Sequence, residues 1–114
     1  MKDTTYVEPA YVRIGIVVLA LTTALVHLSL NFIMGQFDPV FTLNGLGYLT
    51  LLAALFLDLP FARDNRRLVR LVMIGFAIVT IISWIILGDK TWWVGWATKT
   101  VEVSLIALLL MKRP

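Results

Sequence analysis

Four long apolar stretches, separated by short polar segments, dominate the pattern of the chain. They cover about residues 11–34, 40–59, 68–87 and 92–111. Each is close to the roughly 20 residues that a helix rising about 1.5 Å per residue needs to cross about 30 Å of hydrocarbon. None shows the sustained alternation of apolar and polar residues that strands of a membrane barrel show. The pattern therefore predicts four transmembrane helices.

The segments between these stretches are short, so consecutive helices are expected to be antiparallel neighbours. Gly35 and Pro39 mark the first connection, Pro60 the second and Gly88 the third. We predict an all-α fold, an up-down-up-down bundle of four transmembrane helices. It forms a single integral membrane domain over residues 1–114.

Composition supports a membrane as the surroundings of the chain. Of its 114 residues, 60% are hydrophobic and only 15% are charged, and the mean hydropathy is +0.89, which is unusual for a soluble domain. The chain has no cysteine and one histidine. These counts exclude disulfides and thiolate sites, and they argue against a multi-histidine metal centre.

Lysine and arginine are distributed unevenly between the two ends of the predicted helices. One side has Lys2, Arg13, Arg63, Arg66, Arg67, Arg70, Lys112 and Arg113, and the other has Lys90 and, within a helix, Lys99. The positive-inside rule therefore places both termini and the basic loop in the cytoplasm. We expect a multi-pass protein of a prokaryotic inner (cell) membrane. Its first helix is expected to be retained, because it is too long for a signal-peptide core.

The basic loop is defined by Arg63, Arg66, Arg67 and Arg70. Its simplest role is to set the topology, and the alternatives are contact with anionic lipid headgroups or with an acidic partner. Because the basic residues flank apolar stretches and do not share one polar face, the net charge of +3 does not indicate a nucleic-acid partner.

Polar side chains from all four predicted helices fall at a similar depth, in the outer half of the membrane. Charge at that depth costs about 2.5 to 3.5 kcal/mol per residue, so a lysine and a glutamate on one helix require partners. This candidate polar cluster consists of His27, Asn31, Asn44, Tyr48, Thr80, Ser83, Lys99 and Glu102.

Two interpretations of this cluster are open. In the structural one, Lys99 and Glu102 bridge along their own helix, or Glu102 pairs with His27 across the bundle. In the functional one, the carboxylate, imidazole and amine form a proton relay or a site for a small polar ligand.

His27 has a further possible role as an axial ligand of a haem or chlorophyll-type pigment. Small residues precede it, including Thr23 and Ala24, an arrangement similar to that of light-harvesting helices. A histidine that only packs between helices is the simpler interpretation. We expect no other cofactor and no metal.

Three short motifs carry a resemblance to known proteins. They are FTLNGLGY in residues 41–48, NRRLVR in 65–70 and TKTVEV in 98–103. In these the chain resembles small four-helix prokaryotic membrane proteins for which no activity is established. The resemblance implies that Asn44, Gly45, Gly47, Lys99 and Glu102 belong to one pattern.

The expected function is that of an accessory or structural subunit of a larger membrane complex. Its partners would be membrane lipids and other membrane-protein subunits, or further copies of the chain. The alternative is a small homo-oligomeric transporter or channel that uses His27, Lys99 and Glu102, and the third possibility is the pigment-binding subunit. We do not expect an enzyme, because no nucleophile, metal set or phosphate loop accompanies these residues.

Overall fold

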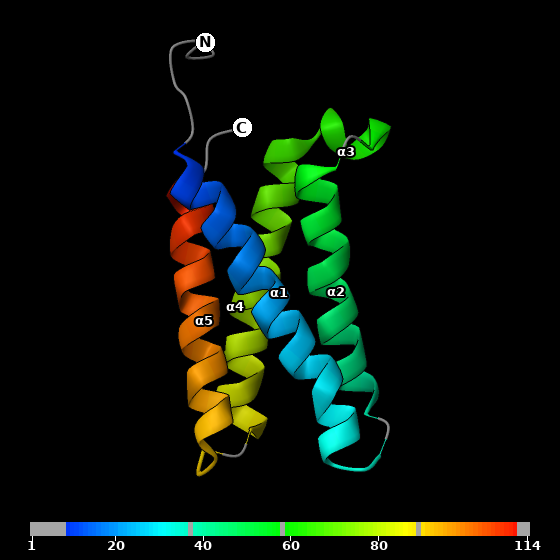
Figure 1. Cartoon of the computed structure of the whole chain (residues 1–114), viewed down its shortest axis with the longest axis vertical. Helices are drawn as coiled ribbons and strands as arrows, with labels where there is room; N and C mark the ends of the chain where they lie inside the picture. Colours follow the sequence, from blue (N-terminus) through cyan, green and yellow to red (C-terminus); the bar gives the residue numbers. More distant parts are fainter. Residues whose placement is uncertain (1–8, 37, 58, 89, 112–114) are drawn as a thin grey trace.

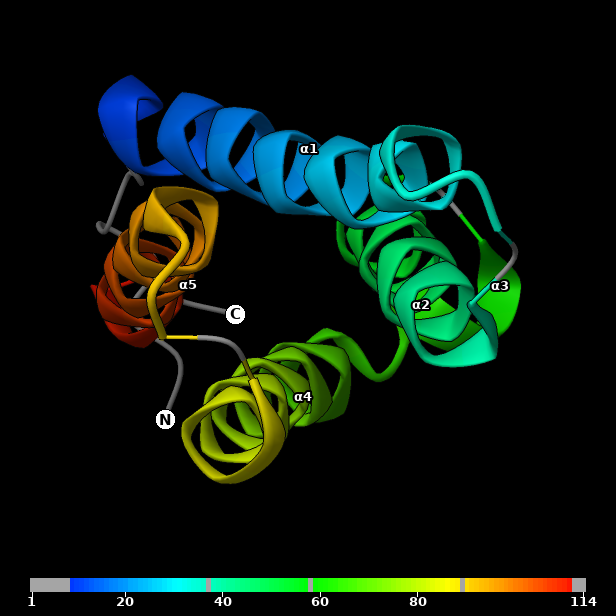
Figure 2. The same cartoon turned by 90° about the horizontal axis from the view of Figure 1, so that it is seen from below.

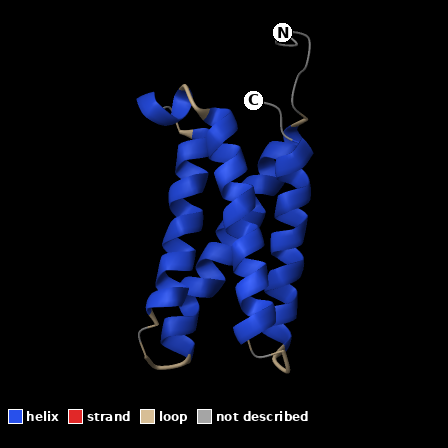
Figure 3. Ribbon diagram, turned by 180° about the vertical axis from the view of Figure 1, so that it is seen from behind, coloured by secondary structure: helices blue, strands red, loops and turns tan. Residues whose placement is uncertain are grey.

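The structure, a computed structural model, describes residues 9–36, 38–57, 59–88 and 90–111. All the regular structure in these ranges is helical (Figure 3). The helices are α1 (Ala10–Ile33), α2 (Pro39–Phe56), α3 (Pro60–Arg63), α4 (Arg66–Leu87) and α5 (Trp93–Met111). All except α3 are long and apolar enough to cross a membrane. The predictions of an all-helical fold and of four such helices are confirmed.

The end of α2 differs from the prediction of a helix over 40–59. The helix ends at Phe56, and Leu57 and Leu59 are extended. Pro60 explains both findings, because its ring would clash with the carbonyl of a helical Phe56 and because proline disfavours a helical residue before it. Pro60 instead begins the single turn of α3, a position that suits proline.

The basic loop is also different from the prediction. Because α4 begins at Arg66 and not near residue 68, Arg66, Arg67 and Arg70 belong to its first turns. Arg63 is the last residue of α3. The four arginines therefore lie on two helices, and the connection between them is only Asp64 and Asn65.

The four long helices form a ring when they are viewed along the bundle (Figure 2). α1 packs against α2 and α5, and α4 packs against the same two helices. In the described part of the chain, the diagonal pairs α1 with α4 and α2 with α5 make no close backbone contact. α1 crosses obliquely, from beside the end of α5 to beside the start of α2 (Figures 1 and 2).

The two ends of the bundle carry different connections (Figure 1). The segments that follow α1 and α4 lie together at one end, which we call the loop end. The short helix α3 lies at the opposite end, which we call the α3 end. The first half of α1 and the second half of α5 are therefore near the α3 end, and the other halves of these helices are near the loop end.

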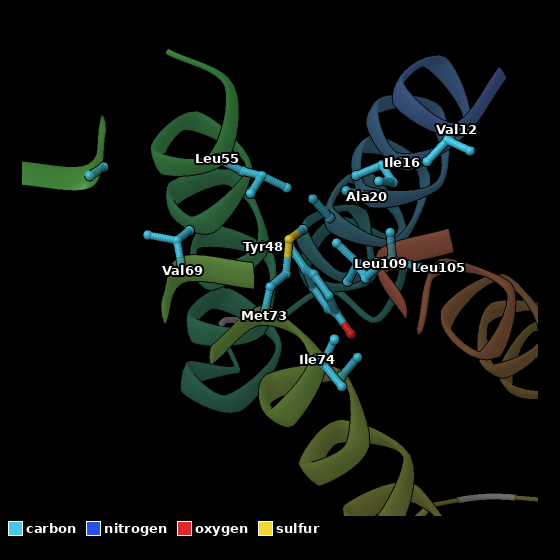
Figure 4. Close-up of a cluster of buried hydrophobic side chains, with 13 residues drawn as sticks. Val12, Ile16, Ala20, Tyr48, Leu55, Val69, Met73, Ile74, Leu105 and Leu109 are labelled. Atoms are coloured by element: carbon cyan, nitrogen blue, oxygen red, sulfur yellow. The ribbon is translucent and has the colours of Figure 1, made fainter. Parts of the chain in front are cut away.

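The half of the interior nearer the α3 end is apolar. Buried side chains from all four long helices meet there (Figure 4). They include Val12, Ile16, Leu55, Val69, Met73, Leu105 and Leu109. Large apolar side chains also cover the outside of the bundle, and Phe32 and Leu87 are 86% and 84% exposed. Lipid is the solvent that tolerates such a surface.

Candidate functional site

Glu102 is the centre of a buried polar network. Its side chain is 0% exposed. Glu102 follows Trp93, the first residue of α5, by nine residues, which is about 14 Å along the helix axis. Its Oε1 accepts a hydrogen bond of 2.6 Å from Lys99 Nζ. Its Oε2 accepts bonds from Thr23 Oγ1 at 2.8 Å and from the Tyr48 hydroxyl at 3.2 Å. One ammonium and two hydroxyls therefore stabilise the carboxylate, as a buried charge requires.

The donors to Glu102 come from three helices. Lys99 precedes Glu102 by three residues on α5, so the two side chains lie on one face. Thr23 belongs to α1 and Tyr48 to α2. The Tyr48 ring also meets Phe76 of α4 edge to face, with 4.9 Å between ring centroids. The carboxylate thus joins α1, α2 and α5, and Tyr48 extends the contact to α4.

His27 lies beside the network and is joined to it through Thr23. The distance from its Nδ1 to the Thr23 carbonyl oxygen is 2.7 Å, and because a carbonyl only accepts, Nδ1 carries the hydrogen. Nδ1 also lies 3.2 Å from Thr23 Oγ1. Of the two structural alternatives, a direct Glu102–His27 bond is not seen among the described residues, and Thr23 connects the two side chains instead. The other structural arrangement, a Lys99–Glu102 bridge along α5, is present.

The surroundings of His27 bear on the pigment interpretation. The centroid of the imidazole lies 6.4 Å from the ring centroid of Phe41 and 6.5 Å from that of Tyr48. With Nδ1 bonded to Thr23, a macrocycle would have to bind at Nε2, and His27 is only 7% exposed. A side chain this enclosed could bind a macrocycle only if the helices around it separated. Within the described residues, no group of three or more acidic or histidine side chains is arranged to hold a metal ion.

Asn31 belongs to a separate group at the loop end. Its Nδ2 donates to Thr42 Oγ1 at 2.7 Å, and its Oδ1 accepts from the Asp38 backbone N–H at 2.7 Å. The Asp38 carboxylate in turn accepts from the backbone N–H groups of Val40 and Phe41 at the start of α2. This is an N-cap, and Asn31 fixes the connection that carries it.

Asn44 and Thr80 form a bridge between α2 and α4. Asn44 Nδ2 donates to Thr80 Oγ1 at 2.7 Å, and Thr80 Oγ1 donates to the Phe76 carbonyl at 2.9 Å. Asn44 Oδ1 is buried without a hydrogen-bond partner in the described residues. The bridge lies next to Tyr48, which follows Asn44 by one helical turn.

Ser83 does not join the other predicted residues. Its side chain is exposed on α4, whereas Thr80 is buried. Three residues turn an α-helix by about 300°, so Ser83 is displaced from Thr80 by about 60° around the axis. That rotation moves it from the edge of the buried face to the outside.

Thr23 is the residue that the sequence analysis missed as a member of the cluster. It is 0% exposed and bonds both Glu102 and His27. The spacing offered a signal, because Thr23, His27 and Asn31 are separated by four residues each and follow one face of α1. The signal was weak because residues 22 and 23 are both threonine. Only the face of α1 on which each side chain lies distinguishes them.

Two arginines of the α3 end donate hydrogen bonds to backbone carbonyls, and the other two are exposed. Arg66 Nη2 donates to the Leu57 carbonyl at 2.9 Å, and Arg70 Nη1 donates to the Leu109 carbonyl at 3.0 Å. Both acceptors lie at C-terminal ends of helices, where carbonyls lack intrahelical partners and a positive charge is favoured. Arg67 is exposed, and the exposed Arg63 lies 3.9 Å from the Asp64 carboxylate.

The polar network runs across the bundle at one level. Lys99 lies on its α5 side and His27 on the side of α1 and α2, with Glu102 and Thr23 between them. The apolar layer of Ile16, Met73 and Leu105 lies between this level and the α3 end. The arrangement holds helices together and provides a buried charge pair. Comparisons of the chain with protein-family models, with curated proteins and with solved structures found no match.

Proposed function

We propose that the chain is an accessory, structural subunit of a larger membrane assembly. In this proposal it crosses a prokaryotic cell membrane four times as an up-down-up-down bundle, with the termini and the α3 end in the cytoplasm. The bundle stabilises itself through its interior and offers an outer helix face to the partner subunits.

The outer face of α4 is the observation that carries this proposal. Gly75 is exposed, and a Cβ added to it would meet no atom within 4 Å. Around it on the same side of the helix are exposed branched and aliphatic residues, namely Leu68, Leu71, Val72, Ile78, Val79, Ile82 and Ile86. A small residue inside such a face allows a second transmembrane helix to approach closely.

The closed interior supports the same proposal. The Glu102 carboxylate accepts bonds from Lys99, Thr23 and Tyr48, so its charge is matched inside the bundle and the outer surface is left for binding. A transporter or channel would use the same buried charges. Its solute would then have to pass the apolar layer between the network and the α3 end, and we therefore favour the subunit role.

The substitution Gly75→Leu tests the proposal. The side chain meets open space in the isolated bundle but would clash with a helix packed on the outer face of α4. We expect the variant to keep its own thermal stability in mild detergent and to lose its co-purifying subunits, as seen by native mass spectrometry of solubilised membranes. Ala107→Leu, at an exposed position of α5, is the matched control and should keep them.

Two results would contradict the subunit role. In one, the native chain is recovered only as a lone protomer. In the other, it forms a discrete complex with copies of itself alone, which would favour the transporter alternative.

A further inference from the structure

A groove opens on the side of the bundle between α4 and α5, in the half nearer the loop end. Its volume is about 520 Å³, and its surface is mostly apolar, with Ile81, Ile85 and Val103 among its walls. This volume lies within the roughly 300–1,000 Å³ of sites for small ligands.

The end of the groove is shaped by two tryptophans. The indoles of Trp84 and Trp96 meet edge to face, with 4.9 Å between ring centroids. Trp84 needs a glycine opposite it, because a Cβ at Gly95 would come within 2.6 Å of its Nε1. Trp96 Nε1 donates to the Lys90 carbonyl at 2.8 Å, which fixes the backbone of that lysine beside the groove. Tryptophan prefers the headgroup level of a bilayer, and this level therefore passes through the mouth of the groove.

Two ammonium groups line the same groove. Lys90 is exposed, and its Nζ lies 5.9 Å from the centroid of the Trp84 ring. Lys99 is buried and uses one of its three N–H groups on Glu102. The groove thus combines a positive charge at Lys90, which makes no ion pair with the described carboxylates, a deeper ammonium whose charge Glu102 matches, and a mostly apolar surface that extends to Ser104. Trp96 and Ser104 are eight residues apart on α5, or about 12 Å.

We propose that this groove binds one anionic phospholipid of the surrounding bilayer. Its phosphate lies at Lys90, and its acyl chain runs along Ile81, Ile85 and Val103 toward Ser104. The exposed charge of Lys90 favours an anionic headgroup, and the mostly apolar surface of the groove suits a hydrocarbon chain. The proposal is independent of the subunit role, because the groove and the Gly75 face lie on different sides of α4.

Native mass spectrometry of the purified full chain tests this assignment. The protein is released from mild detergent after equilibration with phosphatidylglycerol or with phosphatidylcholine, and the retained lipid is counted. We expect one phosphatidylglycerol to be retained in preference to phosphatidylcholine. Lys90→Gln should weaken the retention about fivefold, since a basic residue near a lipid headgroup contributes about 1 kcal/mol. Arg67→Gln, which removes an exposed charge at the α3 end, is the matched control and should have no effect.

A second pair of variants tests the path of the acyl chain. Val103→Trp fills the groove and should abolish the retention, although Lys90 is still present. Val79→Trp adds the same bulk on the outer face of α4, outside the groove. This control should leave the lipid retention unchanged.

Three results would overturn the proposal. The first is equal retention of the two lipids, and the second is an unchanged preference in both Lys90→Gln and Val103→Trp. The third is a dimer of the chain that Val103→Trp dissociates, which would assign the groove to a second copy.

Discussion

A carboxylate inside a bilayer is stable only when its charge is matched, and the pairing of Glu102 shows how this chain achieves that. Three donors surround it, from Lys99, Thr23 and Tyr48. Hydrogen bonds to a charged acceptor are worth about 1.5–3 kcal/mol, more than the roughly 0.6 kcal/mol of an average bond between transmembrane helices. Removal of a single donor should therefore be measurable.

Thr23→Val should destabilise the bundle by about 1.5–3 kcal/mol, because the shape is kept and only the hydroxyl that serves Glu102 is lost. Thr22→Val is the matched control. The Thr22 hydroxyl is exposed and bonds the Val18 carbonyl of its own helix, so its loss should change stability by no more than about 0.5 kcal/mol. Unfolding in detergent, followed by circular dichroism, measures both. Equal effects of the two substitutions would show that Thr23 does not serve the carboxylate.

Lys99→Met should cost about 3–5 kcal/mol, because it leaves the Glu102 carboxylate buried without its counter-charge. In the double variant Lys99→Met with Glu102→Gln, the neutral amide oxygen still accepts from Thr23 and Tyr48, so most of the lost stability should return. The same unfolding measurement compares the two. If the double variant were less stable than the single one, the ion pair would not be the source of the penalty.

The sequence allowed part of this site to be predicted. Lys99 and Glu102 were identified because two charges in an apolar stretch demand partners, and their bridge follows from their spacing of three residues. The role of Thr23 and the exclusion of Ser83 depend on rotations of each helix about its axis. Those rotations are set by packing between helices, which hydropathy does not report.

At the scale of elements, glycines decide how closely helices approach. A Cβ at Gly45 of α2 would come within 2.9 Å of the Ala24 carbonyl of α1, whereas one at Gly75 of α4 would meet no atom within 4 Å. The two positions are both helical, so they share the intrinsic benefit of alanine over glycine. They differ only in the space around them.

Gly45→Ala and Gly75→Ala should therefore change stability in opposite directions. At Gly75, alanine should stabilise α4 by up to about 1 kcal/mol through helix propensity. At Gly45, overpacking against α1 should outweigh that gain and cost about 1–3 kcal/mol. Thermal unfolding in the same detergent measures both. A stabilising Gly45→Ala would mean that α1 and α2 are not in close contact.

Hydropathy predicted the long helices well and the connections poorly. The limits of α1 and α5 agree with the predictions to within one residue. The errors fall between α2 and α4, where Pro60 ends one helix early and starts the short turn of α3. Apolar residues 57 and 59 continued the hydropathic stretch, although the backbone chemistry of proline had already ended the helix.

At the scale of the whole molecule, the interior of the bundle changes along its length. An apolar layer fills the half nearer the α3 end, and the buried ion pair begins at the middle of α5, where Glu102 lies, with Lys99 three residues nearer the loop end. The exposed surface of every long helix is rich in large apolar side chains. These features fit a slab of lipid that the chain crosses repeatedly, with a buried charge that is paired inside the protein.

Accessibility of single cysteines to a membrane-impermeant maleimide tests this account most directly, and the absence of native cysteine makes the chain suited to it. Gln36→Cys and Thr91→Cys lie at the loop end, and Asp64→Cys lies at the α3 end. In sealed vesicles we predict that the first two are labelled from one side, that Asp64→Cys is labelled only from the other, and that Val79→Cys is not labelled. Labelling of all three terminal positions from one side, or of Val79→Cys in intact membranes, would contradict a bundle that spans the bilayer.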